Sequence, residues 1–400
     1  MTRFFIVLAI MVIGCAPSAE TTYKVIPIPA PTTTGSAVPF LFTDANDQVY
    51  LSWVEKQDTI NSFKYARLQD SVWTTPQLIA TGTDWFVNWA DYPMMAAQGQ
   101  DMIAHFLKKS GSGTFAYDVN ITTSADGTGW SAPRVLHGDQ KQAEHGFVTL
   151  LPYEENYLVT WLDGRNTVME GMENMDHHEG HHGVMTLRGA ILDRQGQKIS
   201  EWELDSKTCD CCQTTAAVTD KGPVVVYRDR SDEEIRDIAI VRQVNGQWTE
   251  PEVIFSDQWK IAGCPVNGPR ADAIDNTLVV AWFTAADNQP AVNVIFSEDA
   301  GETFEAPIRI DAGKTIGRVD VVLVDRNSAM VSWMEGADIK VIDVQRDGKK
   351  GISISIATSS DERSSGFPQM TKAGNQLIFA WTDAREKVIK TASVSFKVNQ

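Results

Sequence analysis

Short apolar segments that alternate with turn residues run through almost the whole chain. Runs rich in Val, Ile, Trp and Thr, each about as long as one strand, are separated by Gly, Asn, Asp and Pro. No long stretch has the period of an amphipathic helix. The pattern therefore predicts an all-β protein.

One of these strands recurs at a regular distance. It ends in Trp or another aromatic residue and in most copies an acidic residue follows, as in residues 158–163 and 378–383. The aromatic anchors stand at positions 53, 105, 161, 227, 282, 333 and 381, with His105-Phe106 as the weakest copy. This spacing suits one four-stranded propeller blade per repeat. We expect a single domain over residues 22–400 with seven blades, six being the alternative.

A second motif lies between the repeats and has the form S-x-D-x-G-x-T-[FW]. The full copy and a shortened copy comprise Ser297, Asp299, Gly301, Thr303 and Phe304, and Ser124, Asp126 and Trp130. In such a hairpin turn the Ser and Asp side chains bond the turn backbone, and Gly takes a positive φ. This is the Asp box, and with the aromatic repeat it resembles the sialidase-like β-propeller superfamily over nearly all of residues 22–397.

The last repeat contains only three obvious strands. An isolated strand near residues 23–28 is available to supply the fourth, which would close the ring and remove the exposed sheet edges. Sialidases themselves have six blades, so a ring of seven would depart from that family. The expected fold is an all-β propeller of four-stranded antiparallel blades closed by an N-terminal strand.

The first residues have the pattern of an export signal. Arg3 precedes an apolar run over residues 4–13 that is short for a membrane span. The run ends in Val-Ile-Gly-Cys, which resembles a bacterial lipobox. We expect removal of residues 1–14, acylation of Cys15 and a tether over residues 15–21. The protein would then be a lipoprotein anchored in the cell envelope, on the periplasmic side of the outer membrane or at the cell surface. The alternative is an ordinary signal peptide with a chance cysteine.

The net charge limits the kinds of molecule that the protein is expected to bind. A formal charge of −17 argues against nonspecific nucleic-acid binding, because attraction to phosphates needs a basic surface. The expected partners are the membrane, through the lipid anchor, and a soft metal ion or a small anionic or sugar ligand. The pattern indicates no particular oligomeric state.

The longest expected loop, residues 164–183, carries four of the seven histidines and a run of spaced methionines. Thioether and imidazole groups suit Cu(I) and Cu(II), so copper is expected ahead of zinc. The alternatives are a solvated polar loop or a site that takes any divalent ion. The candidate ligands are Met172, Met175, His177, His178, His181 and His182.

Four further cysteines stand before two successive inner strands. Cys209, Cys211 and Cys212 precede the inner strand of the fourth repeat, and Cys264 precedes that of the fifth. Neighbouring blades would bring them together on the face that carries the Met/His loop. Outside the cytoplasm they would form disulfides, or bind a soft metal together with that loop.

Arginines and acids recur on the same face. Arg270 and Asp272, like Arg318 and Asp320, are two residues apart, so in a strand their side chains share a side. They would form a structural network between blades, or the arginines would bind a carboxylate in the central funnel.

Sialidases need three arginines, a Tyr–Glu nucleophile pair and an Asp acid. This chain lacks the Phe-Arg-Ile-Pro motif of many bacterial sialidases, and Tyr227 with Glu233 or Glu234 is a poor nucleophile pair. The leading prediction is therefore a metal-binding protein rather than a sialidase. The alternatives are an exo-glycosidase acting on a charged sugar, or a noncatalytic propeller that binds a glycan or protein. The residues of the glycosidase alternative would be Arg270, Asp272, Arg318, Asp320 and Tyr227.

Overall fold

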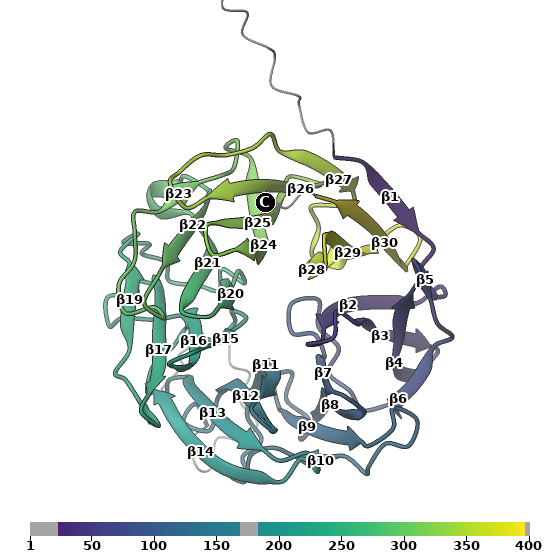
Figure 1. The fold of residues 1–400 in the computed structure, drawn as a ribbon. Coiled ribbons are helices and arrows are strands. Elements are labelled where there is room, and N and C mark those ends of the chain that lie inside the picture. The colour runs from purple at the N-terminus through teal and green to yellow at the C-terminus, as the bar shows by residue number, and fades with distance from the viewer. Residues whose placement is uncertain (1–22, 169–182, 397–400) are drawn as a thin grey trace, which may run out of the picture.

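The computed structural model describes residues 23–168 and 183–396. Seven small sheets stand around a central axis like the blades of a propeller (Figure 1). Within each sheet the neighbouring strands are antiparallel, and the chain passes from an inner strand to an outer strand before entering the next blade. The expected fold and the count of seven blades are both confirmed.

The first four blades follow the order of the chain. Blade one contains β2 (Ser36–Thr43), β3 (Val49–Gln57), β4 (Ile60–Gln69), β5 (Val72–Trp73) and β6 (Gln77–Gly82). Blade two contains β7 (Met95–Gln98), β8 (Asp101–Lys109), β9 (Tyr117–Ser124) and β10 (Arg134–Val135). Blade three contains β11 (His145–Tyr153), β12 (Asn156–Asp163), β13 (Thr186–Leu192) and β14 (Lys198–Asp205). Blade four contains β15 (Thr215–Thr219), β16 (Gly222–Arg228), β17 (Ile238–Val244), β18 (Gln247–Trp248) and β19 (Glu252–Phe255).

The remaining blades complete the ring. Blade five contains β20 (Arg270–Ile274), β21 (Thr277–Thr284), β22 (Ala291–Ser297) and β23 (Ile308–Arg309). Blade six contains β24 (Thr315–Asp325), β25 (Ser328–Glu335), β26 (Asp338–Gln345) and β27 (Ile354–Thr358). Blade seven contains β28 (Gln369–Ala373), β29 (Gln376–Asp383), β30 (Val388–Ser395) and β1 (Val25–Ile28). Two single 3₁₀ turns are η1 (Ala286–Asn288) and η2 (Arg363–Ser365).

The strongest sequence signal comes from the second strand of each blade. This strand lies between two neighbouring blades, so both of its faces are covered, and all eight residues of β21 are buried. The anchors Trp53, Trp161 and Trp282 are fully buried. Burial on both faces explains why these strands read as continuous apolar runs rather than as alternating ones.

The ring is closed by the N-terminal strand. β1 pairs antiparallel with β30, with Val25 opposite Val394 and Ile28 opposite Thr391. The Thr391 hydroxyl also donates a hydrogen bond of 2.7 Å to the Ile28 carbonyl. First and last strands thus share one sheet, which satisfies the backbone groups that β30 would otherwise expose.

The Asp box of blade five forms the turn after β22. The Ser297 hydroxyl accepts a hydrogen bond of 2.8 Å from the Gly301 amide, and Asp299 accepts from the Thr303 amide and hydroxyl at 2.9 and 2.6 Å. Gly301 has φ +79°. The shortened copy repeats the pattern, since Ser124 accepts from Gly127 at 2.9 Å.

Strand order decides which connections share a face. Because successive strands are antiparallel, the connections from the second to the third strand of a blade and from one blade to the next lie at the same end of the sheets. We call this end the b–c face. Within residues 23–168 and 183–396, no helix is long and apolar enough to cross a membrane.

Candidate functional site

Two neighbouring connections of the b–c face carry the cysteines. Cys209, Cys211 and Cys212 lie between β14 and β15, and Cys264 lies between β19 and β20. These connections enter blades four and five, which stand side by side in the ring (Figure 1). The position of the four residues before successive inner strands agrees with the expectation from the sequence.

The sulfur atoms form one cluster. Those of Cys209, Cys211 and Cys212 all lie within 4.8 Å of one another, and Cys209 Sγ is 3.3 Å from Cys212 Sγ. Cys209 and Cys212 are 1% and 2% exposed, and Cys211 is half-buried. Cys264, which is exposed, interacts with the Cys211 thiol. The cluster therefore runs from an exposed thiol to two buried ones.

Arginines surround the buried end of the cluster. Arg236 Nη1 donates a hydrogen bond of 3.2 Å to Cys209 Sγ. Burial by itself raises the pKa of the Cys209 thiol, but hydrogen bonds from Cys211 and Cys212 and the charges of Arg236 and Arg228 lower it well below its usual value. Burial raises the pKa values of Cys211 and Cys212. These directions favour a thiolate at Cys209 and protonated thiols at Cys211 and Cys212, and a metal cation that binds here would displace the remaining protons.

Gln213 ties the cysteine connection to its neighbours. Its Nε2 donates a hydrogen bond of 2.6 Å to the Ala90 carbonyl, and its Oε1 accepts one of 2.9 Å from the Gly268 amide. A Cβ at Gly268 would lie 2.0 Å from the Gln213 carbonyl oxygen, so only glycine allows this approach. The side chain and backbone of Gln213 therefore link the connections that lead into blades two, four and five.

The base of the Met/His loop is bonded to the same region. The Thr208 amide, next to Cys209, donates to the Met185 carbonyl at 2.9 Å, and the Gly164 amide donates to the Glu144 carbonyl at 2.8 Å. The flanks of residues 164–183 are therefore anchored beside the cysteine cluster. The candidate ligands within the loop lie outside the described residues, namely Met172, Met175, His177, His178, His181 and His182.

A second cluster, which the sequence analysis missed, joins blades two and three. The rings of His137 and His145 stack with centroids 3.6 Å apart and planes 14° apart. Asp139 lies at one edge, with its two oxygens 3.3 Å from His137 Nδ1 and 2.9 Å from His145 Nε2. At the other edge Asp118 Oδ1 is 3.6 and 3.7 Å from the remaining ring nitrogens.

Ion pairing explains this second cluster better than metal binding does. Burial lowers the pKa of His145, but the hydrogen bond to Asp139 and the neighbouring carboxylates outweigh it and raise that pKa. Arg165 already supplies a cation, with two hydrogen bonds of 2.7 Å to Asp163. An imidazole binds metal in its ring plane, so parallel stacked rings would have to rotate apart to share an ion. The His-x-Asp spacing of His137 and Asp139 was the available sequence signal.

Three further polar residues line the same interface. The Tyr117 hydroxyl lies 2.7 Å from Glu144 Oε1 and 3.4 Å from Asp91 Oδ2, and Asp91 Oδ1 accepts a hydrogen bond of 2.8 Å from the Phe147 amide. Burial raises the pKa of Glu144 to about 8, with added effects of nearby Asp91 and Cys264, and burial raises that of Asp91 to about 7. Both carboxyl groups therefore retain a proton at mildly acidic pH.

The inner-strand aspartates connect neighbouring blades rather than pairing with the arginines beside them in sequence. Asp272 accepts a hydrogen bond of 2.7 Å from the Leu323 amide of blade six. Arg270 Nη2 instead donates to the Tyr92 hydroxyl and, at 3.5 Å, to Gln369 Oε1. This agrees with the structural-network interpretation for Asp272 and places the Arg270 guanidinium against Tyr92 and Gln369.

The Arg318 guanidinium is occupied by hydrogen bonds to backbone carbonyls. Its guanidinium donates to the Gly366 carbonyl at 2.9 Å and the Glu362 carbonyl at 3.0 Å. Asp320 accepts from the Met370 amide at 2.8 Å. The expected alternation fails here because Arg318 has φ +55° and the register shifts between residues 317 and 320. An Arg270–Arg318 clamp on a carboxylate would therefore need the Arg318 contacts to break.

Tyr227 is not placed for nucleophilic catalysis. It is 1% exposed and its hydroxyl donates to Asp205. Glu234 pairs instead with Arg230 at 2.7 Å, and Glu233 accepts from the Ser231 hydroxyl. The structure does not bring Tyr227 to either glutamate.

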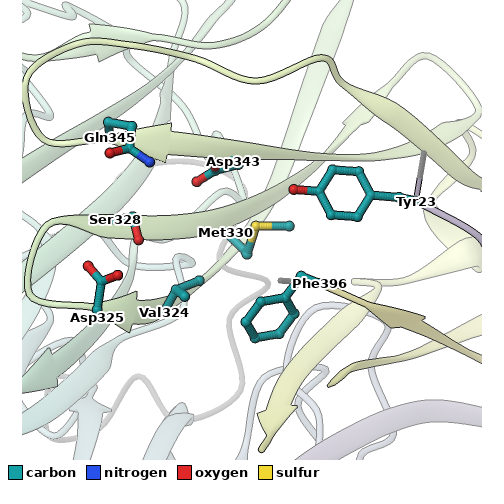
Figure 2. Close-up of a pocket in the computed structure, with 8 residues that line it drawn as sticks. All are labelled: Tyr23, Val324, Asp325, Ser328, Met330, Asp343, Gln345 and Phe396. Atoms are coloured by element: carbon teal, nitrogen blue, oxygen red, sulfur yellow. The ribbon is translucent and has the colours of Figure 1, made fainter. Parts of the chain in front are cut away.

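Two hollows lie between blades six and seven. One, of about 20 Å³, has room for roughly one water molecule and lies at the end opposite the b–c face (Figure 2). It is lined by Tyr23, Val324, Asp325, Ser328, Met330, Asp343, Gln345 and Phe396. The other, of about 340 Å³, is polar and opens on the b–c face beside Asp361 and Arg385. Neither hollow contains a cysteine.

Comparison with known proteins supports the fold alone. No family model and no curated protein matches the chain in sequence. A polysaccharide lyase of known structure is 9% identical over 90% of both chains, with a TM-score of 0.53. A puromycin-hydrolyzing peptidase from Mycobacterium tuberculosis is 10% identical with a TM-score of 0.51 over 94% of this chain, which spans 56% of the peptidase. A Hadza microbial sialidase is 11% identical with a TM-score of 0.42, and the match spans 75% of this chain and 63% of the sialidase.

Proposed function

We propose that this seven-bladed β-propeller binds a soft metal ion, copper ahead of zinc, through the cysteine cluster of its b–c face. The observation that supports the proposal is the meeting of three sulfur atoms within 4.8 Å of one another, next to an arginine that donates to one of them. Thiolates select soft and borderline metals such as Cu(I) and Zn(II). The core ligands would be Cys209, Cys211 and Cys212.

The spacing of the sulfur atoms fits such an ion after a small adjustment. Three thiolates at a metal–sulfur distance of about 2.3 Å stand about 4.0 Å apart in a trigonal site. Cys209 Sγ and Cys212 Sγ are 3.3 Å apart, so they would separate by roughly 0.7 Å. The negative charge of three thiolates around one cation would be offset by Arg236 and Arg228. The Met/His loop, anchored beside the cluster through Thr208, would supply further ligands.

We also propose that the protein works in the cell envelope, tethered through an acylated Cys15. An extracytoplasmic position would expose the site to copper outside the cytoplasm. There the protein could sequester, deliver or sense the metal. It would also keep the cysteines under conditions in which disulfides compete with metal binding.

The test is elemental analysis of the mature protein purified anaerobically from the periplasm, with a parallel thiol count. We expect about one equivalent of copper or zinc with free thiols, and competition with a chromophoric Cu(I) chelator. Cys209→Ser and Cys212→Ser should weaken Cu(I) binding by roughly 100-fold or more. Lys207→Gln is the matched control, since Lys207 lies in the same connection and pairs with Asp232. A metal-free protein with all four cysteines in disulfides and no Cu(I) affinity would refute the proposal.

The alternative function is hydrolysis or binding of a charged sugar. Arg270 favours it, because among the described residues this guanidinium donates hydrogen bonds only to neutral side chains, those of Tyr92 and Gln369. Release of a fluorophore from a sialic-acid or uronic-acid glycoside, lost in Arg270→Ala, would support this alternative. Glycan binding without turnover would indicate the noncatalytic form.

A further inference from the structure

The four sulfur atoms differ in their access to solvent. Cys264 is exposed, Cys211 is half-buried and interacts with Cys264, and Cys209 and Cys212 are almost fully buried. A reagent arriving from solution therefore meets Cys264 first and Cys211 second. Metal binding alone does not require such a graded arrangement, since a closed site would bury every ligand.

We propose that this cluster is also a thiol–disulfide exchange centre in which Cys264 and Cys211 form a disulfide when a small-molecule or protein disulfide reaches the b–c face. The Cys264 thiolate attacks one sulfur of the incoming disulfide, forming a mixed disulfide and releasing one thiolate. The Cys211 thiol then gives up its proton and attacks Cys264 Sγ, which releases the second thiolate. The two cysteines lose two electrons, and their protons go to the two thiols formed from the oxidant.

Two competing pairings are disfavoured by geometry or by access. Cys211 and Cys212 are consecutive, so their Cα atoms are about 3.8 Å apart, shorter than the usual range for disulfides. Cys209 and Cys212 have sulfur atoms 3.3 Å apart, but at 1% and 2% exposure neither can be reached by an external disulfide. The Cys211–Cys264 pair alone among the three combines contact with access.

This inference rests on the proposed function for its biological consequence. Cys211 belongs to the three-thiolate core, so a Cys211–Cys264 disulfide would remove one ligand. The oxidised protein would bind Cu(I) more weakly than the reduced protein, by at least tenfold. Oxidation would thus release the metal, and reduction by a thiol would restore the site.

The exchange chemistry is tested first on metal-free protein. The reduced chain is treated anaerobically with glutathione disulfide, alkylated and digested for mass spectrometry. We expect a Cys211–Cys264 linkage with Cys209 and Cys212 still alkylated. In Cys211→Ser the mixed disulfide of Cys264 with glutathione should accumulate, and in Cys264→Ser neither product should form. A Cys209–Cys212 linkage appearing first, or an unchanged rate of disulfide formation in Cys264→Ser, would overturn the proposal.

Two further measurements keep the test independent of folding and of the metal proposal. In the wild-type chain, intact mass should show a glutathione adduct that forms first and decays as the disulfide appears, and its absence at every time point would count against the mechanism. Cu(I) affinity is measured separately on reduced and oxidised protein. If the reduced chain fails to bind Cu(I), the proposed function fails while disulfide mapping still decides the exchange chemistry. Equal Cu(I) affinity of the reduced and the oxidised protein would refute the proposed release of metal on oxidation.

Discussion

Arg236 and Cys209 meet through a hydrogen bond of 3.2 Å between Nη1 and Sγ. Arg236 comes from the b–c connection of blade four, and Cys209 from the connection that enters the same blade. The contact buries a positive charge against a sulfur atom that is 1% exposed. A charged partner of this kind favours the thiolate, which is the form that binds metal and attacks disulfides.

Removing that charge should change the titration of the cluster. In Arg236→Gln we expect the pKa of the Cys209 thiol to rise, because a neighbouring positive charge that favours the thiolate is lost. The ultraviolet absorbance of the thiolate, followed against pH in metal-free reduced protein, measures this. Arg242→Gln, at the other end of β17, is the control and should titrate like the wild type. An unchanged titration in Arg236→Gln would show that the guanidinium does not stabilise the thiolate.

The Asp box gives a prediction about stability. Asp299 accepts hydrogen bonds from the amide and hydroxyl of Thr303 and from the Ser297 hydroxyl. Asp299→Ala should lower the free energy of unfolding by about 1–2 kcal/mol, because three donors in one turn lose their acceptor. Denaturant unfolding checks this. Glu302→Ala is the matched control, since Glu302 is exposed in the same turn and pairs with a surface lysine, Lys221, so its effect should stay within about 0.5 kcal/mol. Equal effects of both substitutions would contradict the structural role of Asp299.

The second strand of each blade could be predicted from the sequence because it has the same buried environment in every blade. Trp161 and Trp282 are each enclosed between two blades, so every copy is selected for the same apolar pattern. Boundaries were less readable. The inner strand of blade four begins only at Thr215, because the chain before it forms the cysteine connection. The outer edge of that blade is divided into β18 and β19 on either side of Pro251, which has no amide hydrogen to donate.

The candidate site was predictable only where sequence neighbours share a connection. The meeting of Cys209, Cys211 and Cys212 follows from their adjacency, and Cys264 follows from the blade period. The stack of His137 on His145 depends on two blades meeting, and spacing alone does not report it. The expected proximity of the Arg318 and Asp320 side chains is wrong because Arg318 itself has a positive φ, which turns its side chain away. An arginine rarely adopts this conformation, so the sequence did not indicate it.

Closure of the ring by β1 can be tested with a matched pair of substitutions. Ile28 is 5% exposed and packs in the core cluster that contains Trp53, whereas Ile26 on the same strand is 47% exposed. Ile28→Asp should lower the free energy of unfolding by about 3 kcal/mol or more, because it buries an unpaired charge at the seam. Ile26→Asp should change it by less than about 0.5 kcal/mol. Thermal melting compares the two, and light scattering detects aggregation through the freed edge of β30. Similar melting of both variants would mean that β1 does not hold the ring closed.

Glu144 predicts how stability depends on pH. Its folded pKa is raised to about 8, first by burial and then by nearby Asp91, against about 4.3 in an unfolded chain. Below pH 4 both states are protonated and the group has no effect. As pH rises from about 4 to 8 the unfolded chain ionises while the folded state retains its proton, so folding becomes less favourable. Asp91, with a pKa raised to about 7, and His145 contribute in the same direction.

The amide variant separates Glu144 from these other groups. Glu144→Gln cannot ionise yet keeps an oxygen for the Tyr117 hydroxyl, so its stability should fall less between pH 4 and 8 than that of the wild type. The difference in unfolding free energy should grow to about 2–4 kcal/mol at pH 8. Denaturant unfolding at several pH values measures it, and Glu155→Gln, at an exposed glutamate, should follow the wild-type curve. If the unfolding free energies of Glu144→Gln and the wild type change in parallel with pH, the Glu144 carboxyl group ionises as freely in the folded protein as in the unfolded chain. The interface of blades two and three would then contain no protonated Glu144 at neutral pH.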